Sequence, residues 1–153
     1  MKKLILIAFV LAAAYLVATE SGLVTAKRTG VVDTVSGGDQ ILTDAFANHR
    51  SNVQVQGGGI VTKVLADDND GSRHQRFIIQ LGSGQTLLIA HNITLSSRID
   101  SLKEGDRVAF NGEYEWNPQG GVIHWTHHDP AGRHLSGWVK HNGRTYQSSL
   151  RTK

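Results

Sequence analysis

Residues 53–65 read VQVQGGGIVTKVL, and three consecutive glycines interrupt an alternating pattern. On both sides of Gly57-Gly58-Gly59 apolar residues alternate with polar ones, which is typical of a β-strand with one buried face. Glycine inside a strand indicates a bulge or a sharp bend. We therefore expect one bent strand that passes from one sheet to another.

The same alternation recurs later in the chain, in segments that turn residues separate: 76–81, 85–91, 107–116, 121–128, 137–141 and 144–147. Gly82-Ser83-Gly84 joins the first two of these segments and predicts a hairpin. Asn142-Gly143 joins the last two and is the strongest short hairpin signal. The sequence therefore predicts a mainly β protein that ends in a C-terminal hairpin.

Between these strands, the segment 93–102 has a different period. Leu95, Ile99 and Leu102 fall on one face of a helix, so we expect a short helix between strands 3 and 4. This order predicts an OB-fold-like five-stranded Greek-key barrel. Another small half-open β-barrel or a sandwich is the alternative.

The chain before the barrel divides into two segments. Residues 1–26 have a basic start and an apolar run at 4–18, which is typical of a signal peptide and short for a transmembrane helix of about 20 residues. Residues 27–52 predict a spacer with one short helix, which Asp39 would cap, and 53–150 form the barrel domain. We expect an exported protein, periplasmic or secreted, that is anchored to a membrane only if the N-terminal segment stays uncleaved.

Composition limits the classes of partner. The chain has 16 Lys and Arg against 13 Asp and Glu, and a net charge of +3. This excess is too small to support nucleic-acid binding by itself. There are no cysteines, so the fold must rest on its hydrophobic core. Eight histidines would add positive charge below about pH 6.

Four of the histidines lie in HWTHHDPAGRH, residues 124–134. The hairpin register that buries the larger apolar side chains places Trp125 opposite Gly112 in the core. The same register places His124 opposite Glu113 on the outer face. These two form either a surface ion pair worth at most about 1 kcal/mol or an acid–base pair in a groove.

Aromatic residues of the late hairpin predict a second kind of contact. Trp138 and Tyr146 are the better candidates for an exposed stacking platform for bases or sugars, because Tyr114 and Trp125 are expected in the core.

Two groups of residues have the chemistry of divalent-metal ligands. The hairpin should bring His74 beside His91 and Asn92. The acidic loop, residues 67–71 (DDNDG), lies at the same end of the hairpin. The second group is His127, His128, Asp129 and His134, and only a bend near Asp129-Pro130 would bring these residues together. The metal candidates are Asp67, Asp68, Asp70, His74, His91, His127, His128 and Asp129. The alternative is a solvated turn, since Asp, Asn and Gly dominate turns.

Four stretches resemble a family of small exported bacterial proteins whose domain has no assigned function: DDNDGSRHQRFIIQL, TLLIAHNI, EGDRVAFNGEYEWNPQGGVIHWTHHDPAGRH and GWVKHNGRTYQ. The resemblance runs from about Val53 to Gln147 and implies no roles for its residues. The chain also resembles, more loosely, the staphylococcal-type nucleases, exported OB-folds with carboxylates, arginines and a calcium ion on the barrel face. Residues of those types here are Asp67, Asp68, Asp70, Arg76 and Glu113, at a spacing that departs from the nuclease pattern.

We favour a binding protein over an enzyme. Its polar ligand, an oligosaccharide, nucleic acid or small anion, would contact the outer sheet face through His74, Arg76, His91, Asn92, Glu113, His124 and Trp138. The first alternative is a metal-dependent hydrolase of the phosphodiesterase type, with Glu113 or His124 as general base. The second is a pH-responsive structural or interaction protein of the cell envelope.

Overall fold

The structure is a computed structural model that describes residues 31–148, with side chains from residue 37 onward. The signal peptide predicted at 1–26 lies outside the described residues. Among those described, no helix is long and apolar enough to cross a membrane.

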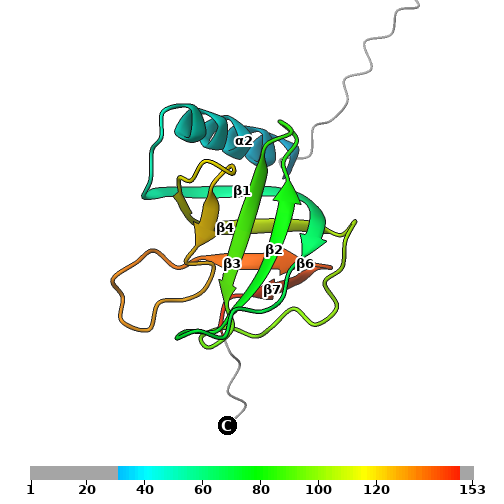
Figure 1. The fold of residues 1–153 in the computed structure, drawn as a ribbon, viewed down its shortest axis with the longest axis vertical. Coiled ribbons are helices and arrows are strands. Elements are labelled where there is room, and N and C mark those ends of the chain that lie inside the picture. The colour runs from blue at the N-terminus through cyan, green and yellow to red at the C-terminus, as the bar shows by residue number, and fades with distance from the viewer. Residues whose placement is uncertain (1–30, 149–153) are drawn as a thin grey trace, which may run out of the picture.

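Five strands close into a barrel (Figure 1). They are β1 (Val53–Val64), β2 (His74–Gln80), β3 (Thr86–Asn92), β4 (Arg107–Glu115) and β5 (Val122–His124). Their order is β1-β2-β3-β5-β4, and β4 pairs again with β1. Only β3 and β5 run parallel among these pairs. The predicted OB-fold-like five-stranded barrel is thus confirmed.

The C-terminal hairpin is also present. β6 (Trp138–His141) pairs with the first half of β4, and β7 (Arg144–Tyr146) returns along β6. Its turn is at Asn142-Gly143, where both residues have positive φ, of 48° and 78°. Asparagine and glycine tolerate this conformation best, so the sequence signal and the turn agree.

The bend in β1 occurs at its glycines. Residues 53–60 pair with β4, residues 60–64 pair with β2, and the register shifts between Val61 and Lys63. A Cβ on Gly57 would lie 2.9 Å from the Phe110 ring, and one on Gly58 would lie 2.8 Å from the Val108 carbonyl oxygen. A Cβ on Gly59 would collide with the Gln80 carbonyl. β1 can therefore pair with both β4 and β2 only because residues 57–59 have no side chains.

One helix, α2 (Val31–Ala47), lies across an end of the barrel (Figure 1). Leu42 and Ala45 are fully buried and belong to the same core as the barrel strands. The helix is longer than the short one predicted within 27–52, and it contributes to the core instead of forming part of a spacer.

The predicted helix at 93–102 is wrong, because this segment consists of turns and bends. The Asn92 Oδ1 accepts the backbone N–H groups of residues 94 and 95, at 2.9 and 3.2 Å, which forms a turn instead of a helix. Further along, the buried Gln75 carboxamide bonds both backbone groups of Ile99, at 2.8 and 3.0 Å. These bonds replace the ladder of a helix, while the apolar spacing still buries Ile99.

The predicted burial of Trp125 is also wrong. The expected register is present, with Tyr114 opposite Ile123, but β5 ends one residue before Trp125. Trp125 has a φ of 52° and is only half-buried. The space beside Gly112 is filled by the His124 carbonyl, by the Ile123 side chain and by the fully buried Thr126, whose Cγ2 lies 3.0 Å from the position of a Cβ there.

Replacement of Gly59 by alanine should destabilise the barrel. The added methyl group would meet the backbone carbonyl of Gln80, which belongs to a paired strand and cannot move alone. We expect Gly59→Ala to lower the free energy of unfolding by about 1–3 kcal/mol, measured by chemical denaturation. Gly37→Ala in α2 is the matched control, since nothing lies within 4 Å of its Cβ. It should be neutral or stabilising by about 0.5–1 kcal/mol. Equal stability of Gly59→Ala and wild type would contradict the packing described for β1.

Candidate functional site

The outer face of β2, β3, β5 and β4 carries two adjacent rows of side chains. In the polar row, Arg76 lies opposite Ala90, and His124 lies opposite Glu113. The parallel register of β3 and β5, with Ile89 opposite Ile123, places Ala90 and His124 side by side. All four members of the row are half-buried. The barrel thus brings three of the predicted ligand-binding residues onto one surface.

The apolar row lies next to it, one step closer to the turn between β2 and β3. It consists of Ile78, Leu88 and Val122, which face one another across three strands. Each is half-buried. Aliphatic side chains in a line beside an arginine, a histidine and a glutamate form a surface that can contact a ligand with both apolar and polar parts.

Two histidine–glutamate pairs border this face. The Nε2 of His124 lies 3.6 Å from the Oε2 of Glu115, and the Nδ1 of His134 lies 3.8 Å from the Oε2 of Glu113. Glu113 therefore faces His134, although His124 is its neighbour across the strands. Partial burial holds the pKa of His124 below its ordinary value, against the opposing effect of Glu115.

The loop after β5 holds His134 in place. Its ring stacks on Trp125 with a centroid distance of 3.6 Å and an interplanar angle of 14°. The Asp129 carboxylate accepts the backbone N–H groups of Ala131, Arg133 and His134 at 2.9, 2.7 and 3.1 Å. These bonds keep the pKa of Asp129 below its ordinary value. The Trp125–His134 pair was missed from the sequence, where Asp129-Pro130 indicated only a bend.

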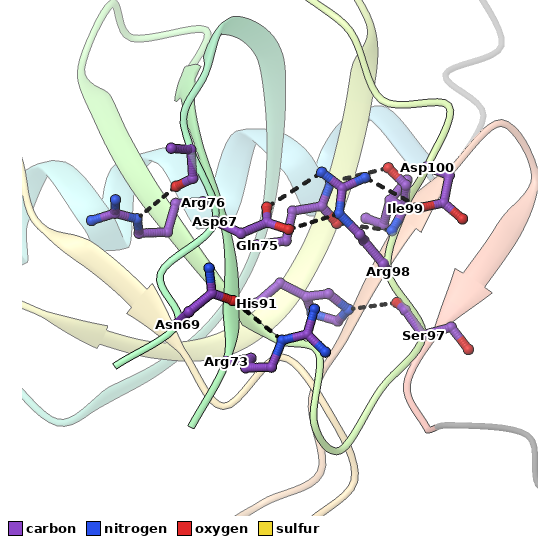
Figure 2. A network of polar contacts seen from close by, with 11 residues as sticks. Asp67, Asn69, Arg73, Gln75, Arg76, His91, Ser97, Arg98, Ile99 and Asp100 are labelled. Carbon is purple, nitrogen blue, oxygen red and sulfur yellow. Dashed lines mark hydrogen bonds and ion pairs between the residues drawn. The ribbon is translucent and has the colours of Figure 1, made fainter. Parts of the chain in front are cut away.

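His91 was predicted beside His74 but lies inside the barrel. β2 and β3 pair His74 with Asn92 and place His91 opposite Gln75. His91 is fully buried, with Nδ1 2.8 Å from the Thr126 hydroxyl and Nε2 3.3 Å from the Ser97 carbonyl, a contact drawn in Figure 2. A carbonyl can only accept, so Nε2 carries the proton and Nδ1 accepts from Thr126. The pKa of His91 is lowered to about 4, chiefly by burial; the hydrogen bond to Ser97 acts in the opposite direction, and the nearby His127 and His74 add to the lowering.

Two residues of the acidic loop contact arginines, Asp67 with Arg98 and Asn69 with Arg73 (Figure 2). Asp67 accepts hydrogen bonds from the Nε and Nη2 of Arg98, at 2.9 and 3.3 Å. The Asp68 Oδ1 accepts the backbone N–H of Asp70 at 3.1 Å, as in an Asx turn. Asp67 is therefore committed to an ion pair, and Asp68 to shaping the loop.

The later metal candidates also point apart. His127 is buried, with Nδ1 2.8 Å from the His128 carbonyl. His128 is exposed, with Nδ1 3.0 Å from the Ser136 hydroxyl. Among the side chains that the structure describes, from residue 37 to 148, no three histidine, aspartate or glutamate side chains are grouped so that they could hold a metal ion.

The aromatic residues of the last hairpin differ from one another. Trp138 is half-buried opposite Asn111 on β4, and the Lys140 Nζ lies 4.4 Å from its ring centroid. Tyr146 was predicted to be exposed, but it is 7% exposed and packs in the core, under the Arg144 guanidinium at 4.9 Å. Only Trp138 of this pair can offer part of its ring to a ligand.

The chain matches, over residues 25–147, the model of the family described as "Protein of unknown function (DUF3465)". It belongs to this family. The resemblance to an uncharacterised family that the motifs indicated is thereby confirmed, and the family description states no activity. The comparisons with curated proteins and with solved structures give no match.

The burial of His91 should make stability depend on pH. Its pKa falls from 6.5 to about 4 on folding, so the unfolded chain binds the proton first as the pH decreases. The stability that His91 contributes is therefore complete above pH 6.5 and is lost as the pH falls towards 4, by roughly 3 kcal/mol.

The measurement compares wild type with His91→Gln, whose carboxamide can replace both hydrogen bonds. We expect the difference in free energy of unfolding between the two proteins to shift in favour of the variant between pH 7 and pH 4. The contributions of the carboxylates to the pH dependence cancel in this comparison, because the carboxylates titrate alike in both proteins. A difference that stays constant with pH would show that His91 is not the responsible group.

Proposed function

We propose that this chain is a binding protein that holds a polar ligand on the outer face of β2, β3, β5 and β4. The observation that carries this proposal is the polar row, in which strand pairing aligns Arg76, His124 and Glu113 beside the apolar row. OB-fold barrels use the face of strands 2 and 3 and the adjoining loops to bind oligonucleotides and oligosaccharides, so the location agrees with the fold. The fold alone does not determine the ligand, which must be argued from the side chains.

Arg76 is the main anchor for such a ligand. Its Nε donates to the Ala66 carbonyl at 3.2 Å, which fixes the guanidinium and leaves the two terminal amino groups (Figure 2). In the described part of the chain it forms no ion pair with a carboxylate, whereas Arg98 is paired with Asp67 and Asp100. A half-buried guanidinium with donors to spare favours a ligand that offers oxygen acceptors.

The balance of charge on this face favours an oligosaccharide over a nucleic acid. Glu113 and Glu115 lie on the same side of β4 as the polar row, and their negative charges would repel a phosphate backbone. Carboxylates and imidazoles do form hydrogen bonds with hydroxyl groups. The carbon-bound hydrogens of a sugar ring would contact the apolar row.

A hydrolytic role has less support from the geometry. The catalytic ion was expected among His74, His91 and the acidic loop, yet His91 lies inside the barrel and Asp67 is paired with Arg98. Export remains part of the proposal, since a signal-like segment at 1–26 would deliver the binding face to the cell envelope or beyond.

Removal of Arg76 should weaken ligand binding selectively. The test screens the purified protein by calorimetry against neutral and acidic oligosaccharides, single-stranded oligonucleotides and inorganic anions. For the ligand that binds best, we expect Arg76→Ala and His124→Ala each to lower the affinity about 10-fold or more, because each removes a charged or polar partner. Arg73→Ala is the matched control, since its side chain is exposed and bonds Asn69 in the adjoining loop. The proposal fails if no class of ligand binds, or if both variants bind like the wild type.

A further inference from the structure

A hollow of about 440 Å³ lies at the end of the barrel that α2 covers. Three segments far apart in the sequence line it: residues 43 and 46 of α2, residues 83–86 of the turn between β2 and β3, and residues 118–120 of the turn between β4 and β5. Its volume falls within the range of about 300–1,000 Å³ that small-molecule sites occupy. It is separate from Arg76 and His124, which do not line it.

Hydrogen bonds tie each pair of these segments together. The Ser83 backbone N–H donates to the Asp39 Oδ2 of α2 at 3.1 Å. The Gln85 side chain donates to the Gly120 carbonyl at 2.9 Å, and the indole N–H of Trp116 donates to the Phe46 carbonyl at 3.2 Å. The hollow is therefore formed before any ligand arrives, which removes an ordering cost from binding.

The lining combines an apolar surface with neutral polar groups. Phe46 and Pro118 supply the apolar surface, Thr43 and Ser83 supply hydroxyl groups, and Gln119 supplies a carboxamide. Among the described residues that line it, none is charged. The Asp39 carboxylate, which accepts the backbone N–H of Ser83 in the wall, would disfavour an anion. This chemistry suits a ligand that is neutral, compact and rich in hydroxyl groups.

We propose that this hollow is a binding site for a neutral sugar ring. The carbon-bound hydrogens of the ring would lie on Phe46 and Pro118. Its hydroxyl groups would bond Ser83 and Gln119 and would donate to the Thr43 Oγ1, whose own hydrogen goes to the Asp39 carbonyl at 2.9 Å. The proposal stands on the lining of the hollow and does not require the outer face to bind anything. Thr86 lies between the hollow and the outer face, since it lines the hollow and precedes Leu88 of the apolar row by two residues on β3.

The test is a nuclear magnetic resonance titration of the ¹⁵N-labelled protein. The probes are glucose, galactose, mannose and N-acetylglucosamine, with glucuronate and adenosine as comparators. We expect saturable shifts of the backbone amides of Ser83, Gly84, Gln119 and Gly120 with at least one neutral sugar, and weaker binding of glucuronate and adenosine. Shifts at Arg76 and His124 report the outer face independently, so the two proposals can fail separately.

Two variants in α2 decide whether the hollow itself is the site. Thr43 is exposed and lines the hollow, so Thr43→Trp should fill it and weaken sugar binding about 10-fold or more. Ile41 is 43% exposed and does not line it, so Ile41→Trp should bind like the wild type. The proposal is overturned if no neutral sugar gives saturable shifts up to about 100 mM. It is also overturned if Thr43→Trp binds as tightly as Ile41→Trp, or if glucuronate or adenosine binds best.

Discussion

The close approach of backbones at Gly57, Gly58 and Gly59 is the constraint on which the barrel depends. β1 must pair with β4 along its first part and with β2 along its last part, and it changes partner where these residues have no side chains. Without this change, β2 and β4 could not belong to one closed sheet. The pairings β2–β3, β3–β5 and β5–β4 align the polar row, and closure through β1 holds the two outer strands of the row, β2 and β4, in one barrel.

Buried polar groups fix the segments that the strands leave irregular. Gln75 bonds both backbone groups of Ile99, and the Thr126 hydroxyl bonds His91 on β3. The buried His141 bonds the Asp106 carboxylate at 2.8 Å, and this bond holds the pKa of Asp106 below its ordinary value. Each of these groups would be costly to leave unpaired in the core, by about 1–3 kcal/mol. They therefore specify one arrangement of the loops in a chain that has no disulfides.

Patterns between near neighbours were sufficient for much of the fold. Alternation and turn residues predicted the hairpins, the pairing of Glu113 with His124, and the closed barrel. The failures at 93–102 and at Trp125 have a common cause. In the first, the decisive bonds come from Gln75, which is 24 residues away from Ile99. In the second, the left-handed backbone of Trp125 ends the strand, and nothing in the local alternation indicates it.

The residues of the candidate site also differ in how far the sequence could place them, according to whether they lie on regular strands or on loops. Register alone could place Arg76, His124 and Glu113 on one face, because each lies within a regular strand. It could not place His134, which reaches Glu113 only because Asp129 folds the loop back and Trp125 supports the imidazole ring. It also could not reveal the hollow, whose walls meet only after α2 has packed across the end of the barrel.

This division has a physical consequence for recognition. Residues on paired strands keep their spacing, so in the proposed binding role the polar row would present Arg76, His124 and Glu113 at fixed separations along a ligand. The loop that carries His134 and the three segments around the hollow are irregular, but hydrogen bonds hold each of them in one arrangement as well. A ligand that spans the polar row and the hollow would therefore be selected for its length by the spacing of the row and for the shape of its end by the hollow. The charged and polar side chains of the row would select the class of ligand, and the shape of the hollow would distinguish among its members.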